Sequence, residues 1–67
     1  MKFHELIKVI SYDQDEITLI FPNDDNVKST YTRLTDIPIT YADYKVIEVY
    51  GYDASGYDGL IISIVEE

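Results

Sequence analysis

The residues in this chain that could do chemistry are mostly carboxylates, gathered in three short clusters. In chain order the clusters contain Asp13 and Asp15, Asp24 and Asp25, and Asp53 and Asp58. Such hard oxygen ligands suit calcium, but no cluster has the EF-hand spacing, with glycine at the sixth position and a carboxylate at the twelfth. Asp, Asn, Ser and Gly are also the residues that ordinary turns require. We interpret the clusters as turns and expect no metal ion and no cofactor.

The chain lacks the sets of residues that other common catalytic sites require. His4 is the single histidine and there is no cysteine, so a zinc site has no ligand set. No serine stands in the Gly-x-Ser-x-Gly context of a hydrolase nucleophile. Paired carboxylates acting as acid and base need a roomy cleft, which a domain of this size rarely encloses. We therefore expect the protein not to be an enzyme.

The charge of the chain indicates what it binds. Thirteen acidic and five basic side chains give a net charge of -8. The negative electrostatic field of this charge repels phosphate backbones and anionic membranes. We therefore expect a basic protein partner, no direct binding of nucleic acid and no binding to a membrane. Seven tyrosines add rigid contact surfaces with polar tips. Tyr57, between Gly56 and Asp58, joins the six aspartates as a predicted interaction residue, and the aspartates would form one acidic rim if the hairpins pointed the same way.

Length and composition predict one domain covering residues 1–67. The apolar content of 46% is typical of a globular protein. With no disulfide to brace a small core, burial of extra apolar surface in a second copy is favoured. The longest apolar run, residues 60–62, is too short for a bilayer, and charge interrupts the N-terminus before a signal peptide could form. These features predict a cytoplasmic protein.

Apolar periodicity predicts one helix and four strands. Phe3, Leu6, Ile7 and Ile10 recur at helical spacing, so residues 3–11 should form a helix with one apolar stripe. Alternation and β-branched residues predict strands over residues 16–21, 27–34, 45–52 and 60–65. Residues 35–44 do not alternate, but Thr40 and Asp43 have capping-box spacing for one helical turn. Residues 53–59 are expected to form a loop.

Together these elements predict an α+β fold in which the N-terminal helix packs on a four-stranded, mainly antiparallel sheet. The last strand is apolar on both faces apart from Ser63, which favours a central position. The sheet side of the core should contain Ile17, Leu19, Val49, Ile62 and Ile64. The alternative is a small five-stranded barrel with residues 2–10 as its first strand.

Three segments resemble small acidic proteins encoded by phages and mobile elements of Gram-positive bacteria, most of them without an assigned function. The segments are residues 2–10, 34–38 and 44–50. The resemblance implies a helix-then-sheet domain and an accessory role in a mobile element of a host cell. Because such proteins include inhibitors of host defence nucleases, it also implies a non-enzymatic inhibitor that occupies a basic, nucleic-acid-binding surface. The alternative function is a self-associating structural or accessory protein, for example a homodimer paired through exposed sheet edges.

Overall fold

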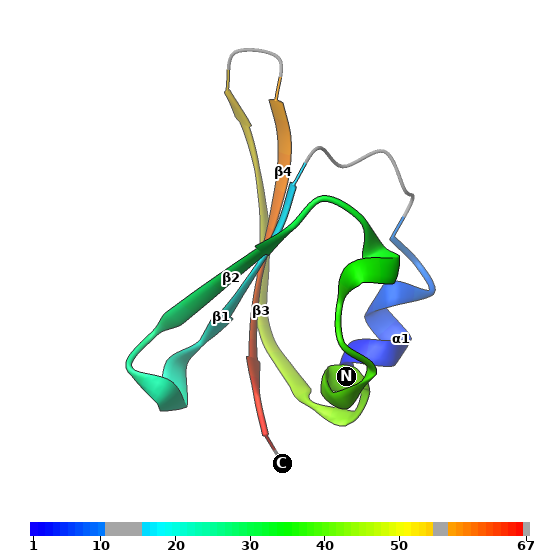
Figure 1. Ribbon diagram of the computed structural model, residues 1–67, viewed down its shortest axis with the longest axis vertical. Helices are drawn as coiled ribbons and strands as arrows, with labels where there is room; N and C mark the ends of the chain where they lie inside the picture. Colours follow the sequence, from blue (N-terminus) through cyan, green and yellow to red (C-terminus); the bar gives the residue numbers. More distant parts are fainter. Residues whose placement is uncertain (11–15, 55–56, 67) are drawn as a thin grey trace.

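The structure of the protein is a computed structural model that describes residues 1–10, 16–54 and 57–66. Its elements, in chain order, are α1 (Phe3–Ile7), β1 (Glu16–Phe21), η1 (Pro22–Asp24), β2 (Val27–Tyr31), η2 (Leu34–Asp36), η3 (Ile39–Asp43), β3 (Lys45–Ala54) and β4 (Tyr57–Val65). The η elements are short 3₁₀ helices. The chain therefore folds as one short helix followed by two β-hairpins, as Figure 1 shows.

The strands form one open, mixed sheet in the order β2-β1-β4-β3. Each hairpin is antiparallel, as predicted, but the hairpins join through a parallel pairing of β1 with β4, which places Leu19 opposite Ile62. β4 is central, as the apolar character of both its faces predicted. The barrel alternative is wrong, because residues 3–7 are helical and β2 and β3 are edge strands.

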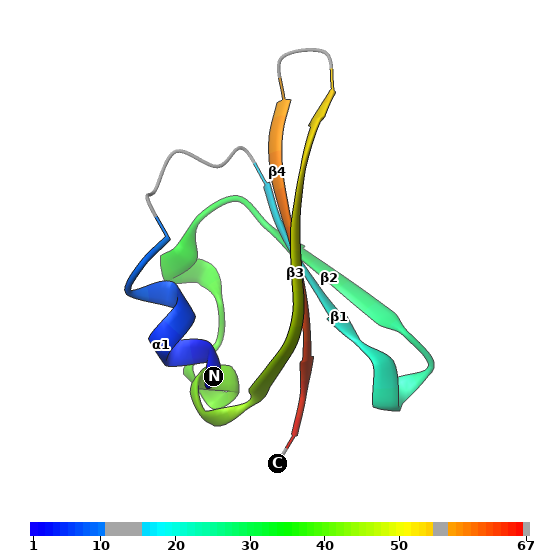
Figure 2. The same ribbon diagram turned by 180° about the vertical axis from the view of Figure 1, so that it is seen from behind.

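The parallel central pair fixes the direction of the two hairpins. The β1–β2 turn follows the C-terminal end of β1, whereas the last described pair of the other hairpin, Ala54 with Tyr57, lies at the N-terminal end of β4. Since β1 and β4 run the same way, this pair and the β1–β2 turn lie at opposite ends of the sheet (Figures 1 and 2).

Helix α1 is shorter than the predicted helix over residues 3–11. The amide of Lys2 donates to Oε1 of Glu5 at 2.8 Å, which satisfies one donor at the start of the helix. After Ile7 the chain tightens, because the amide of Val9 bonds the carbonyl of Leu6, three residues back, at 3.0 Å. The apolar stripe docks through Phe3 and Leu6, which are both buried. The helix is thus held by packing rather than by its own length.

Two boundaries of the hairpins also differ from the prediction. β2 ends at Tyr31, and the chain from residue 34 enters η2 instead of extending the strand. β3 and β4 continue into the predicted loop of residues 53–59, where Asp53 pairs with Asp58 and Ala54 with Tyr57. Turn-forming residue types predicted a loop there, but pairing between the strands extends the ladder past them.

The core lies between the sheet and the layer formed by α1 and residues 32–44, which cover one side of it in both views (Figures 1 and 2). Four of the five predicted sheet positions are buried: Ile17, Leu19, Ile62 and Ile64. Val49 is the exception at 41% exposure, because β3 has a neighbouring strand on one side only. Ile37 was not predicted, yet it is 9% exposed and packs into the core after η2.

Candidate protein-interaction surface

The predicted acidic residues occupy both ends of the molecule. Asp24 and Asp25 lie in the β1–β2 turn, while Asp53 and Asp58 pair near the end of the β3–β4 hairpin. Because the hairpins point in opposite directions, these two pairs do not form one rim. Asp13 and Asp15 lie outside the described residues. For residues 52–54 and 57–58, Tyr57 included, the structure describes the backbone only, so their part in binding stays a prediction.

The turn between β1 and β2 has the chemistry expected of its residues. Pro22 begins η1, and Asp25 and Asn26 follow with φ of 54° and 56°. Asn and Asp tolerate this left-handed region better than other side chains, since their short polar groups bond the local backbone. Asp24 and Asp25 are both exposed. The turn therefore presents two solvated carboxylates on a fixed backbone.

Next to this turn, three aromatic rings from separate segments form a cluster. Phe21 ends β1, Tyr41 belongs to η3, and Tyr44 precedes β3. The ring centroid of Tyr41 is 5.0 Å from that of Phe21 and 5.1 Å from that of Tyr44, in tilted and edge-to-face arrangements. These are favourable geometries for aromatic pairs. All three side chains are partly exposed, so the cluster also forms a surface.

The rings line an open groove of about 380 Å³, which we call the aromatic groove. Its lining includes the cluster of Phe21, Tyr41 and Tyr44 and the acidic side chains of Asp24 and Glu66. No lysine, arginine or histidine contributes to it from the described part of the chain. The groove thus joins apolar faces to negative charge.

One hydrogen bond links the rings to the acidic side chains. The hydroxyl of Tyr44 donates to Oε2 of Glu66 at 3.4 Å. Loss of hydration raises the pKa of Tyr44, and the negative charge of Glu66 raises it further. The tyrosine therefore stays protonated at neutral pH, and its hydroxyl is a donor to the Glu66 carboxylate.

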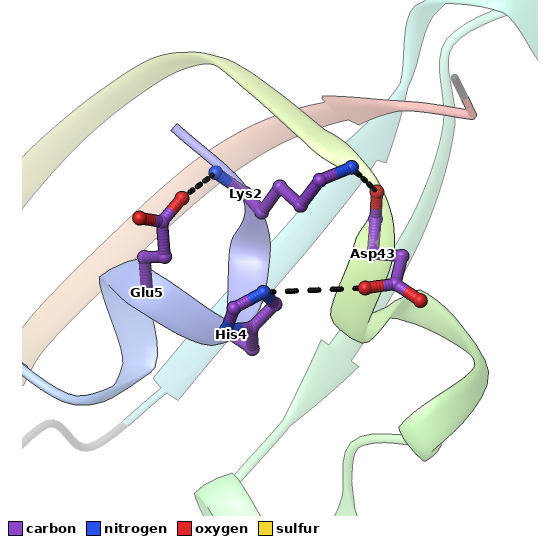
Figure 3. Close-up of polar contacts among 4 residues, drawn as sticks. All are labelled: Lys2, His4, Glu5 and Asp43. Atoms are coloured by element: carbon purple, nitrogen blue, oxygen red, sulfur yellow. Dashed lines mark hydrogen bonds and ion pairs between the residues drawn. The ribbon is translucent and has the colours of Figure 1, made fainter.

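A second groove lies between α1 and the η2–η3 segment and has a different character. It is about 490 Å³, mainly apolar, and includes His4, Lys8 and Ile39 in its lining. His4 faces the exposed carboxylate of Asp43 with a separation of 4.0 Å, and Lys2 donates from Nζ to the carbonyl of Asp43 at 3.3 Å (Figure 3). Such exposed contacts contribute little to stability. Among the described residues, this groove has the ammonium group of Lys8 in its lining and no carboxylate.

Tyr41 and Tyr44 lie within residues 35–44, for which the sequence predicted one helical turn and no groove. Their spacing of three residues across a predicted helical turn was a usable signal, because such residues lie on one face. Phe21 and Glu66 gave no signal, since they reach the groove only because the parallel pairing of β1 with β4 brings the C-terminal ends of these strands together. Sequence patterns alone do not place residues 21, 44 and 66 together.

Metal sites, membrane-spanning helices and similarity to known proteins were considered in turn. Within residues 1–10, 16–54 and 57–66, no group of three or more His, Cys, Asp or Glu side chains is placed to hold a metal ion. None of the helices in the described ranges is long and apolar enough to cross a membrane. Comparison with models of protein families, with curated proteins and with solved structures gave no match to this chain.

Proposed function

We propose that this chain is a non-enzymatic module that binds a basic surface of a protein partner. The observation that carries the proposal is the aromatic groove, in which the rings of Phe21, Tyr41 and Tyr44 adjoin the carboxylates of Asp24 and Glu66. Aromatic residues are enriched in the centres of protein interfaces, where they supply contact area and hydrogen-bonding tips. The net charge of -8 favours basic partners over acidic ones.

The proposed partner is a host defence protein whose nucleic-acid-binding surface the module occupies. The Cα atoms extend over 35 Å along the longest axis, close to one turn of a DNA duplex at about 34–36 Å. Acidic residues lie near both hairpin ends. A basic groove shaped for about one duplex turn would then meet negative charge at two separated points. This arrangement supports inhibition by occupancy and requires no catalytic group.

Competition tests the proposal directly. Basic nucleic-acid-binding proteins captured from a bacterial lysate are purified, and their binding to a labelled DNA duplex is followed by fluorescence anisotropy. The module should displace the duplex, and its association rate with the partner should fall as salt rises. If partner, duplex and module form a ternary complex instead, occupancy of the nucleic-acid surface is refuted.

Two matched double variants locate the contact. The first variant combines Asp24→Asn with Asp25→Asn, and the second combines Asp53→Asn with Asp58→Asn. Each removes two negative charges, and the two variants do so at opposite ends of the sheet. Asn preserves the left-handed conformation at Asp25. Slower association with one pair alone assigns that end to the partner. Association as fast as wild type with both pairs, at low salt, shows that charge in these turns does not contribute.

The second candidate function is self-association through the β3 edge. β3 is a ten-residue edge strand on which Ile47, Val49 and Tyr50 are 50%, 41% and 46% exposed. A long apolar edge is a template for pairing with another strand. Sedimentation equilibrium decides between a dimer and a monomer. The amide of Val46 already bonds the carbonyl of Met1, so the test uses the outward-facing β3 amides beyond it. A monomer at tens of micromolar, in which these amides exchange rapidly with solvent, excludes this alternative.

A further inference from the structure

The aromatic groove has the composition of a site for one cationic side chain. The ring centroids of Phe21 and Tyr44 are 6.4 Å apart. The ring centroid of Tyr41 is 5.0 Å from that of Phe21 and 5.1 Å from that of Tyr44. Aromatic faces attract a cation that sits within about 6 Å of the ring centroid. Because the three rings pack against one another, the cation would lie on their exposed faces rather than between them.

Charge decides which kind of group fits. Asp24 and Glu66 both contribute to the lining, and both are exposed. An anionic ligand would be repelled, and a neutral apolar ligand would gain nothing from the two carboxylates, which water hydrates. The groove beside α1 has the ammonium group of Lys8 and, among the described residues, no carboxylate in its lining. Only the aromatic groove of these two therefore complements a cation.

Geometry favours arginine over lysine. A guanidinium is planar, so it stacks on a ring while its edge donates two hydrogen bonds to a carboxylate. Glu66 accepts from the Tyr44 hydroxyl through Oε2 at 3.4 Å, so its carboxylate lies near the edge of the aromatic cluster. A lysine ammonium is a compact and strongly hydrated charge that gains less from a flat aromatic surface. The volume of about 380 Å³ is at the small end for ligand sites and suits a side chain rather than a large cofactor.

We propose that the aromatic groove binds an arginine side chain of the basic partner, with the guanidinium stacked on the exposed ring surface and paired with Glu66 and Asp24. This inference rests on the proposed function and names the group recognised at that surface. Tyr44 contributes one of the three rings, and its hydroxyl donates to the Glu66 carboxylate.

A peptide titration tests the inference without the partner. The capped tripeptides Gly-Arg-Gly, Gly-Lys-Gly and Gly-citrulline-Gly are added to the full chain at constant ionic strength, and amide and aromatic NMR shifts are recorded. We expect saturable shifts at Phe21, Tyr41 and Tyr44 with the arginine peptide, weaker ones with lysine, and none with citrulline, which is neutral. Equal shifts with all three peptides, or shifts elsewhere alone, overturn the inference.

Variants separate a real site from general attraction to an acidic protein. Glu66→Gln should weaken binding of the arginine peptide about two- to fivefold, and Tyr41→Leu by a similar factor. Asp36→Asn, which removes the same charge from η2 outside the groove, is the matched control and should leave binding unchanged. Because Glu66 is exposed, its variant should stay folded, and its amide spectrum verifies this. Equal weakening by Glu66→Gln and Asp36→Asn refutes the site.

The two proposals fail separately. If Gly-Arg-Gly leaves the groove unshifted while a basic partner still binds in a salt-dependent way, the arginine site is wrong and the binding module stands. If the groove binds Gly-Arg-Gly but the module never competes with duplex on a basic protein, the proposed function is wrong and the site stands.

Discussion

Truncating Leu6 measures how much the docking of α1 contributes to the fold. Leu6 is 9% exposed, so nearly all of its side chain has left water. Leu6→Ala removes three carbons, each worth roughly 0.8 kcal/mol, which gives about 2.4 kcal/mol before any cavity cost. A chain of 67 residues has a total stability of about 3–10 kcal/mol at roughly 0.05–0.15 kcal/mol per residue. The alanine variant should therefore lose a large share of the stability and still fold.

Leu6→Asp should go further and unfold the domain. It loses the same apolar contacts and sets a carboxylate against Phe3 and the sheet, and an unpaired charge buried there costs several kcal/mol more. Val9→Asp is the matched control, because Val9 lies two residues past α1 and is 71% exposed. The control places the same charge in solvent and should change the free energy of unfolding by no more than about 0.5 kcal/mol.

Urea unfolding followed by far-UV circular dichroism and tyrosine fluorescence gives the three free energies, since the chain has seven tyrosines and no tryptophan. Leu6→Ala should lower the midpoint without changing the slope. Leu6→Asp should show no folded baseline in water. A wild-type midpoint for Leu6→Asp would refute the docking of α1 on the sheet, as would equal destabilisation by Val9→Asp.

Four further outcomes are expected. Ile37→Ala should destabilise the domain by about 2–3 kcal/mol in urea unfolding, whereas Ile39→Ala, at 89% exposure, should change it by less than about 0.5 kcal/mol; equal effects would contradict the burial of the η2–η3 segment. The hydrogen bond from the Lys2 amide lowers the pKa of Glu5 below its usual 4.5, so the stabilisation by this carboxylate is present above pH 4.5 and lost as the pH falls through the lowered pKa. The stability advantage of wild type over Glu5→Gln should accordingly vanish on acidification, and a constant advantage across pH would disprove the link. Thermal midpoints in excess calcium and in chelator should agree, and a rise specific to calcium over magnesium would overturn the interpretation of the acidic clusters as turns. Mobility-shift assays at physiological salt should show no complex with duplex DNA, because an acidic chain releases no counterions from a polyanion.

The spacing of apolar residues predicted the helix and the strands, because a helix or strand that buries one face has apolar residues at a regular interval. The spacing of Phe3 and Leu6 predicted a helix, and the alternation of Ile17 and Leu19 predicted a strand with one buried face. A helical turn before β3 was also predicted and appears as η3, but its cap position is Pro38 and it has no side-chain cap, so the predicted capping box of Thr40 and Asp43 is wrong. Such information lies within a few residues of sequence, so it is readable without the tertiary structure.

Pairing between strands was decided by the tertiary structure. The periodicity of a strand shows which of its residues share a face, but it does not show which other strand lies beside it. The pairing of β1 with β4, which are far apart in the sequence, therefore left no signal in the pattern of either strand. Their parallel pairing sends the two acidic hairpin ends in opposite directions. The strand order also places β3 at an edge of the sheet. Val49 on this strand is therefore exposed, although Ile62, with which it pairs on β4, is buried.

The acidity and the richness in tyrosine are properties of the sequence, and they predict the class of partner. Their arrangement into a groove is not, since Phe21, Tyr44 and Glu66 belong to distant segments that meet only when the hairpins join. Ile37 shows the same division, because its burial depends on where the loop crosses the sheet. Composition is a sum over residues and survives any arrangement of the chain, whereas a site requires a particular arrangement, which long-range packing alone provides.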